Sequence, residues 1–116
     1  QAMKIWEKYK YNRKLVVVYN NIGDVALMKG DTNTAFDYFQ KSLTLCNKFQ
    51  CIRGKIQSLV SFGQAYNKLG RFQTAEKYLT EAFELSNLVE NKPFLEAIID
   101  NLAIAKSKII NFNYYK

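Results

Sequence analysis

Cys46 and Cys51 have the spacing that most readily suggests chemistry, because two thiols five positions apart could form a redox pair or half of a metal site. A structural zinc site needs four ligands, which are mainly cysteine and histidine side chains. The chain of 116 residues contains no histidine and no third cysteine. We therefore expect no metal and no cofactor, and we interpret the pair as one core thiol and one loop thiol, both reduced, in an intracellular protein.

Carboxylates in the second half of the chain are the other candidates for catalysis. They are Glu76, Glu81, Glu84 and Glu90. Their spacing distributes them along the outer side of one predicted helix, which is typical of a solvated face. The sequence also has no glycine-rich phosphate loop and no serine in a nucleophile-elbow context. We therefore predict that the chain is not an enzyme.

Positive charge gathers in the first half of the chain, and the formal net charge is +7. Up to Lys55 there are ten basic and four acidic residues, against seven and six in the remainder. The cluster consists of Lys4, Lys8, Lys10, Arg13 and Lys14, followed by Arg53 and Lys55. A helical-repeat module that binds nucleic acid through this basic half is our alternative function. Residues that recognise successive bases should recur with the period of the repeat, and these basic residues do not. The pattern therefore favours a solvated surface or one that faces an acidic partner.

The composition is that of a folded domain. With 48% hydrophobic and 23% charged residues, five glycines and one proline, the chain can bury a core and is not typical of disorder. It contains no run of about eighteen apolar residues and no signal peptide, so we expect no membrane contact and a cytoplasmic location. Because the sequence lacks a natural start, we expect it to be a piece of a longer protein.

The sequence repeats itself after 40 residues. The stretch NNIGDVALMKGDTNTAFDYF from Asn20 matches VSFGQAYNKLGRFQTAEKYL from Val60 in its glycines, one threonine, one alanine and one tyrosine. Apolar residues recur in both at three- and four-residue steps, which predicts helices, and Gly30 and Gly70 predict tight turns. We expect an all-α domain of about six helices, over 2–11, 13–29, 32–49, 53–69, 72–89 and 93–111.

The period also predicts the domain organisation. One helix pair cannot bury its apolar face alone, so pairs of this kind stack as a helical solenoid. We expect a single domain over 1–116, built from a partial repeat at 1–11, repeats at 13–50 and 53–90, and a partial repeat at 93–111.

These positions resemble the tetratricopeptide repeat family, whose first helix carries an aromatic residue, leucine, glycine and tyrosine, and whose second carries alanine and phenylalanine. The matching sets are Tyr19, Ile22, Gly23, Ala26, Ala35 and Phe39, then Leu59, Phe62, Gly63, Tyr66, Ala75 and Leu79, and more weakly Ile99, Leu102, Ala103 and Lys106. The resemblance covers essentially the whole chain and implies a right-handed superhelical solenoid of antiparallel helix pairs. The period of 40 departs from the usual 34. The lengthened form is similar to the repeats of spindle-orientation adaptors, kinesin light chains and peptide-sensing regulators of Gram-positive bacteria.

The resemblance implies a concave groove, lined by the first helix of each pair, that binds an extended peptide within a larger adaptor or regulatory protein. Carried over to this chain, the groove positions are Asn20, Asp24, Leu27, Gln57, Val60, Gln64, Asn67, Lys68, Asp100, Asn101 and Ile104. Amides both donate and accept hydrogen bonds, so we expect the asparagines and glutamines of this set to pair with a peptide backbone and to face solvent in the free protein.

One ligand is disfavoured by the same comparison. Chaperone-binding members hold a C-terminal carboxylate with lysine, arginine and asparagine side chains. The matching positions here are Asn20, Asp24, Ser61, Ala97 and Asn101, which supply no cation. We therefore do not expect a chaperone C-terminal tail as the partner.

Apolar residues near both ends of the chain predict self-association. They are Ile5, Trp6 and Tyr9 at one end and Ile99 and Leu102 at the other. In a solenoid a neighbouring repeat would cover such faces, so we expect copies of this chain to associate through them.

Overall fold

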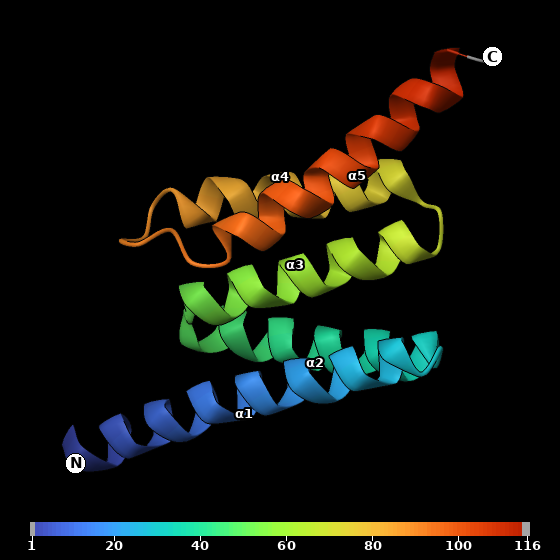
Figure 1. The fold of residues 1–116 in the computed structure, drawn as a ribbon. Helices are drawn as coiled ribbons and strands as arrows, with labels where there is room; N and C mark the ends of the chain where they lie inside the picture. The colour runs from blue at the N-terminus through green and yellow to red at the C-terminus, as the bar shows by residue number, and fades with distance from the viewer. Residues whose placement is uncertain (1, 115–116) are drawn as a thin grey trace. The chain divides into compact units, whose positions relative to one another are not determined.

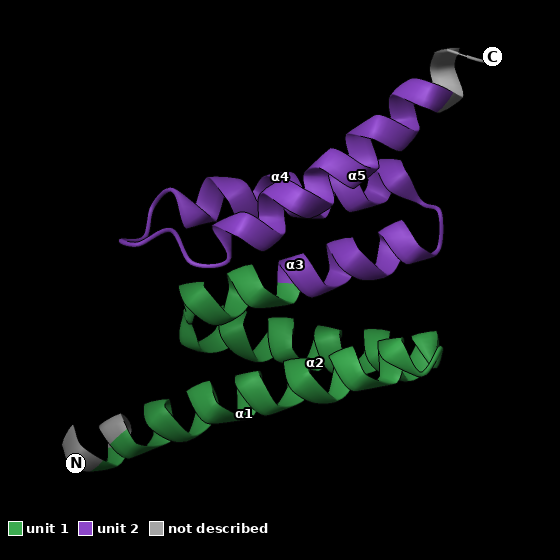
Figure 2. Ribbon diagram, in the orientation of Figure 1, with its two compact units in different colours: residues 1–58 green, residues 59–116 purple. Residues whose placement is uncertain are grey.

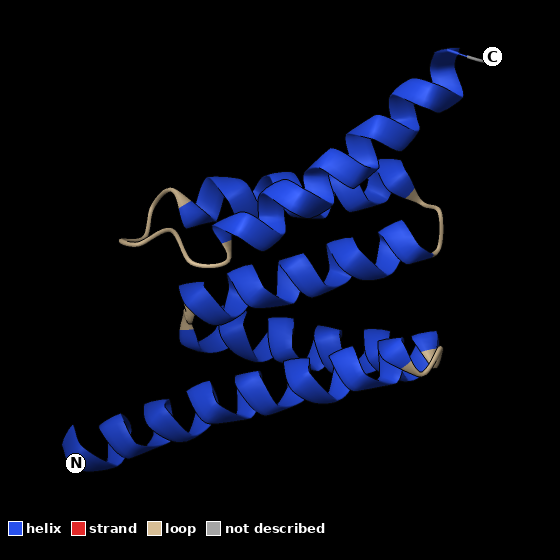
Figure 3. Ribbon diagram, viewed as in Figure 1, coloured by secondary structure: helices blue, strands red, loops and turns tan. Residues whose placement is uncertain are grey.

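The structure is a computed structural model that describes the backbone of residues 2–114 and the side chains of residue 4 and residues 7–111. Within residues 2–114 there are five helices and no strand, as Figures 1 and 3 show. The helices are α1 (Ala2–Met28), α2 (Thr32–Phe49), α3 (Ile52–Lys68), α4 (Phe72–Ser86) and α5 (Leu95–Tyr114). The expectation of an all-α chain is confirmed for this range.

The expected count of six helices is wrong, because the predicted helices at 2–11 and 13–29 form one continuous helix. This helix, α1, has 27 residues. The stretch around Tyr11 contains no glycine or proline that would end a helix. Forty residues later the chain does turn, because Gln50 adopts a left-handed backbone conformation with φ of 56°.

The chain divides into two compact units, residues 1–58 and residues 59–116 (Figure 2). The division falls inside α3. Unit 1 contains α1, α2 and the first part of α3, and unit 2 contains the rest of α3 together with α4 and α5.

In unit 1 a tight turn joins α1 to α2 and reverses the chain. Gly30 has φ of 84°, a conformation in which a Cβ would be strained. The amide of Asp31 donates to the Ala26 carbonyl oxygen at 2.9 Å, which satisfies one of the free carbonyls at the helix end. The Asp31 carboxylate then accepts from the Thr34 amide at 3.3 Å and caps α2.

Gly23 allows α1 and α2 to approach closely in unit 1. A Cβ at Gly23 would lie 2.7 Å from Cδ1 of the Phe39 ring and 3.2 Å from the Ala35 carbonyl oxygen. Ala35 and Phe39 are both fully buried at this crossing. These residues of the repeat pattern therefore lie where α1 and α2 cross.

Unit 2 is built around the corresponding pair of glycines. Gly70 has φ of 78° and lies in the turn from α3 to α4, where the Arg71 amide donates to the Tyr66 carbonyl oxygen at 2.9 Å. A Cβ at Gly63 would lie 2.5 Å from Cδ2 of Leu79, so the glycine again sets the distance between two helices.

The α4–α5 pair completes unit 2. Ala75 and Leu79 of α4 pack with Ala105 of α5 in a buried cluster. At its surface the Lys106 ammonium lies 3.1 Å from the Glu76 carboxylate. Helix α4 therefore has one face against α5 and another against α3 within this unit.

The connection from α4 to α5 is longer than the other turns and differs from the prediction. α4 ends at Ser86 rather than at 89, and α5 begins at Leu95 rather than at 93. Between them Asn91, Lys92 and Phe94 have φ of 66°, 39° and 61°, which no helix can contain. Pro93 is therefore part of the connection, where its carbonyl oxygen accepts from the Ser86 hydroxyl at 3.1 Å.

Candidate functional site

Asn20, the first residue of the predicted peptide groove, is completely buried, so the expectation that it faces solvent is wrong. The Ser58 hydroxyl lies 3.2 Å from Asn20 Oδ1 and 2.7 Å from the Ser42 hydroxyl. The Ser58 hydroxyl also lies 3.0 Å from the Gly54 carbonyl oxygen. These side chains form a polar cluster between α1, α2 and α3, which we call the Asn20–Ser42–Ser58 cluster. Asn20 therefore joins helices of unit 1 and is not available to a peptide.

The other predicted groove residues of unit 1 differ in exposure. Leu27 is buried, with 7% of its surface exposed, and so cannot be an open apolar pocket. Asp24 and Gln57 are half-buried. Of the predicted positions in this unit, Asp24 and Gln57 are thus the ones that a ligand could touch.

In unit 2 two of the predicted amides are already hydrogen-bonded within the protein. Asn67 Nδ2 donates to the Asn101 carbonyl oxygen at 3.1 Å and so connects α3 to α5. Asn101 Nδ2 donates to the Ala97 carbonyl oxygen in its own helix at 2.8 Å. Asn67 Oδ1 is buried and has no hydrogen-bond partner in the part of the chain that the structure describes. Val60, another predicted groove residue, is also buried.

The remaining predicted residues of unit 2 are accessible on α3 and α5, the two helices that Asn67 connects. They are Gln64, Lys68, Asp100 and Ile104, which we call the α3–α5 surface. Gln64 is half-buried, Lys68 and Asp100 are exposed, and Ile104 is 47% exposed. Among the described residues none of the three polar side chains makes a hydrogen bond or ion pair. This surface offers a free amide, one charge of each sign and one apolar contact.

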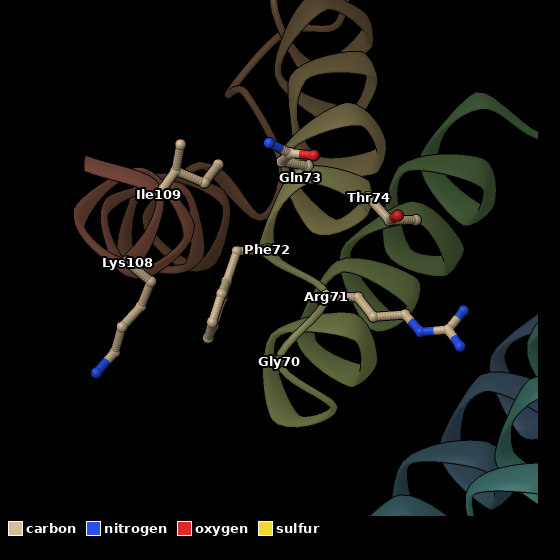
Figure 4. A pocket seen from close by; sticks show the side chains of 7 residues that line it. All are labelled: Gly70, Arg71, Phe72, Gln73, Thr74, Lys108 and Ile109. Carbon is tan, nitrogen blue, oxygen red and sulfur yellow. The ribbon is translucent and has the colours of Figure 1, made fainter. Parts of the chain in front are cut away.

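A hollow that the sequence did not predict lies at the turn between α3 and α4 in unit 2. It has a volume of about 550 Å³ and is lined by Gly70, Arg71, Phe72, Gln73, Thr74, Lys108 and Ile109. Figure 4 shows the Phe72 ring between the Gly70 turn and the α5 residues Lys108 and Ile109, whereas the Arg71 side chain points away from α5. The Gly70 turn was predictable, but nothing in the local sequence indicated that Lys108 and Ile109 lie beside it.

A second hollow, of about 660 Å³, lies between α1 and α2 in unit 1. It is lined by Leu15, Tyr19, Asp37, Gln40, Lys41, Thr44, Leu45 and Lys48. The Tyr19 and Tyr38 rings pack beside it with their centroids 5.8 Å apart. Leu15 and Tyr19 are half-buried, because this side of α1 is open.

The basic residues of unit 1 lie partly against aromatic rings. The Lys8 ammonium is 5.9 Å from the centroid of the Phe49 ring, and the Arg13 guanidinium is 5.7 Å from that of the Tyr9 ring. At these distances the cations are attracted to the faces of the rings. The cluster therefore also contributes to packing around the end of α2.

Both cysteines are free and buried, including Cys51, the predicted loop thiol, which lies between α2 and α3. They pack with Val16, and Tyr9, Leu45 and Phe49 cover them. Burial, together with the neighbouring Cys51 thiol, raises the pKa of the Cys46 thiol from its usual 9.0 to about 12. Burial also raises the pKa of Cys51. At neutral pH both thiols are protonated and weakly nucleophilic.

The apolar residues predicted to mediate self-association have different environments. The side chains of Ile5 and Trp6 lie outside the described residues. Tyr9 and Leu102 pack against the cores of their units, and Ile99 is 50% exposed. Of this set, Ile99 alone presents a largely open apolar surface among the described side chains.

Among the described residues no three cysteine, aspartate or glutamate side chains come together in a way that could hold a metal ion. In the same range no helix is both long enough and apolar enough to cross a membrane.

Comparison with known proteins identified one family. The family model described as tetratricopeptide repeat matches residues 16–49 and 56–87, two stretches that begin 40 positions apart. Neither the curated proteins nor the solved structures include a significant match. The two matched stretches correspond to the helix pairs α1–α2 and α3–α4.

Proposed function

The chain belongs to the tetratricopeptide repeat family, and from that premise we propose that it is a non-catalytic module that binds an extended peptide segment of a partner protein on its α3–α5 surface. Repeats of this family generally mediate contacts between proteins. The lengthened spacing supports a place in a larger adaptor or regulatory protein, similar to the families with long repeats named above.

The observation that carries this proposal is the unpaired state of Gln64, Lys68 and Asp100 on a surface that Asn67 already holds in place. The bond from Asn67 to Asn101 fixes α3 against α5, so the surface is organised before a ligand arrives. Preorganised groups lose less conformational freedom on binding. The Gln64 amide can both donate to and accept from a peptide backbone, while Ile104 offers an apolar contact on α5.

The test uses peptides selected from a displayed random library on the immobilised chain. We expect a selected peptide to bind the Gln64→Ala, Ile104→Ala double variant about five- to a hundredfold more weakly, because a lost hydrogen bond and a lost apolar contact each cost about 0.5–1.5 kcal/mol. The matched control is Lys77→Ala with Thr80→Ala, which changes two exposed residues of α4. Equal affinity for wild type and the Gln64→Ala, Ile104→Ala variant would contradict the proposal.

Two further expectations are tested on the same material. If nucleic acid were the ligand, binding would fall steeply with salt and would be lost on neutralising Lys8, Lys10 and Arg13, whereas peptide binding should survive that change. Self-association through Ile99 remains a prediction, and light scattering of wild type against Ile99→Glu checks it.

A further inference from the structure

One side of α1 is apolar and open to solvent. Positions 11, 15, 18, 22 and 25 are separated by steps of four and three, so they lie along one side of the helix. Tyr11, Val18, Ile22 and Val25 are 65%, 47%, 40% and 50% exposed, and Leu15 is half-buried. We call these five residues the α1 seam. Alternating steps of four and three are the pattern with which one helix packs along another.

The same positions are covered one repeat later. Forty residues on they are Cys51, Lys55, Ser58, Phe62 and Ala65, of which Lys55 is half-buried and the other four are buried. Within unit 1 the Ser58 hydroxyl lies 2.7 Å from that of Ser42, so at Ser58 this side of α3 faces the helix α2. The α1 seam is therefore the side of α1 that corresponds to the side of α3 on which another helix packs. Among the described residues no helix packs on the seam.

The hollow between α1 and α2 adjoins the seam and extends it onto α2. Leu15 belongs to both, and Tyr19 and Leu45 continue the apolar surface. Gln40 and Thr44 line the α2 side, where the Gln40 amide lies 3.3 Å from the Thr44 hydroxyl. The combined surface is thus apolar along α1 and polar along α2, which suits a ligand with one apolar and one polar side.

Positive charge borders this surface. Lys41 and Lys48 line the hollow, and neither they nor Lys14 of α1 makes an ion pair among the described residues. Lys41 and Lys48 instead lie over the rings of Tyr38 and Phe49, at 4.8 Å and 5.6 Å from the centroids. The carboxylate that lines the hollow is that of Asp37. Residues 1–58 carry ten basic and four acidic side chains, so the field over this unit is positive.

We propose that the α1 seam and the adjoining hollow bind an amphipathic helix of a partner protein, with apolar residues at steps of three and four and acidic residues on both flanks. The apolar side would cover the seam, and the acidic flanks would meet Lys14, Lys41 and Lys48. A second copy of this chain fits less well, because its own α1 would bring the same positive charge. This surface is separate from the α3–α5 surface, and the proposal does not depend on peptide binding there.

The test uses a fluorescent peptide of about 20 residues, long enough to form a helix, with leucines at steps of three and four and glutamates on both flanks. A matched peptide has lysines in place of the glutamates. We expect the acidic peptide to bind at least tenfold more tightly than the basic one by fluorescence anisotropy. Val18→Glu with Ile22→Glu should lower its affinity at least tenfold, whereas the control Ile99→Glu on α5 should leave it unchanged.

The charge contribution is tested separately with Lys41→Glu and Lys48→Glu. This variant should weaken the acidic peptide about tenfold and reduce the salt dependence of binding, and Lys77→Glu on α4 serves as its control. Circular dichroism establishes that each variant is folded, and Ile22→Ser replaces the double glutamate variant if that one is not.

Three results would overturn the proposal. The first is equal binding of both peptides, or binding of the acidic peptide that the seam variants leave intact. The second is a concentration-dependent dimer of wild type that Val18→Glu with Ile22→Glu abolishes, which would make the seam an interface between copies. The third is displacement of the acidic peptide by a single-stranded oligonucleotide whose own binding needs Lys41 and Lys48. A peptide selected on the α3–α5 surface should bind the seam variants normally, so failure of either proposal is recognised independently.

Discussion

Three buried positions recur in both units, but their residues are polar in unit 1 and apolar in unit 2. In unit 1 these positions hold Asn20, Ser42 and Ser58, and forty residues later they hold Val60, Ala82 and Ile98. All six residues are buried. In both units a glycine opposite a large side chain sets the distance between paired helices. The residues at the three buried positions are therefore free to differ between the units. In unit 1 the hydrogen bonds at these positions are directional, and they fix which atoms of three helices must meet.

The largest expected effect comes from replacing the glycine at the helix crossing, a feature that both units share. Gly63→Leu should lower the free energy of unfolding by about 3 kcal/mol or more, at or above the upper end of the usual cost of overpacking, because Leu79 occupies the required space. Gly23→Leu should cost at least as much, since the Ala35 carbonyl oxygen beside it is main chain and cannot rotate away. Urea unfolding measures both.

Ala103→Leu is the matched control for these substitutions. Ala103 takes the place of Gly23 and Gly63 in the third copy of the pattern, and it is exposed on α5. Its replacement should change stability by less than about 0.5 kcal/mol. Comparable losses at 63 and 103 would mean that the crossing is not what makes glycine necessary.

The second prediction concerns variants that exchange polar and apolar residues at these buried positions. Asn20→Ala should cost about 1–3 kcal/mol, because a cavity forms and the Ser58 hydroxyl loses an acceptor. Val60→Asn in unit 2 should cost a similar amount, about 1–3 kcal/mol, by burying an amide in place of an apolar side chain.

Changing the whole cluster should behave differently. Asn20→Val with Ser42→Ala and Ser58→Ile gives unit 1 the residues of unit 2, and removing all partners together should be close to neutral. Chemical denaturation of the single and triple variants measures the difference. A triple variant as unstable as the sum of its parts would show that shape, not hydrogen bonding, distinguishes the two units at these positions.

The residues at these positions also show what the sequence could predict. Helices α2 and α3 and both glycine turns were predictable, because apolar spacing and left-handed glycines act locally. The burial of Asn20 was not, because Ser58, which donates to its side chain, lies 38 positions away and Ser42 joins the cluster only through Ser58. A polar residue on a first helix also suggests a ligand contact. A signal did exist: all three polar residues correspond to apolar ones in the next repeat.

The continuity of α1 and the later start of α5 were missed for related reasons. Nothing near Tyr11 favours or forbids a turn, so the repeat alone suggested one. Left-handed conformations at Lys92 and Phe94 are not preferred by those residue types and result from the folded surroundings. The sequence predicted Asn67 and Asn101 as ligand contacts, but not that the Asn67 amide donates to the Asn101 carbonyl oxygen and the Asn101 amide to that of Ala97.

A third, smaller difference lies at the starts of the second helices. Asp31 caps α2, whereas Arg71 occupies the same position before α4 and makes no side-chain cap. Asp31→Ala should cost about 1 kcal/mol, and Arg71→Asp should stabilise unit 2 by a similar amount, about 0.5–1 kcal/mol. Asp31→Asn keeps the acceptor and is the control. Thermal unfolding that does not respond to Arg71→Asp would indicate that α4 has no free amides to cap.

The smallest effect concerns Cys46, whose counterpart in unit 2 is Ser86. Its pKa is raised on folding, so the associated stability is fully present below the usual value of 9.0 and is lost as pH rises toward about 12. Between pH 7 and pH 9 wild type should therefore lose about 0.4 kcal/mol relative to Cys46→Ser. Denaturation of both proteins at each pH gives the difference, and a gap that widens in the opposite direction would contradict the assigned burial.

The connection between α4 and α5 has a practical consequence for anyone who wishes to label or extend this molecule. Glu90, Asn91, Lys92 and Phe94 are exposed, and the stretch belongs to neither flanking helix. Exposed loop tips of this kind tolerate inserted sequence far better than a capped three-residue turn such as the one at Gly30. A fluorescent tag or an inserted domain after Asn91 would interrupt neither α4 nor α5, so that ligand binding to the α3–α5 surface could be followed on the labelled protein.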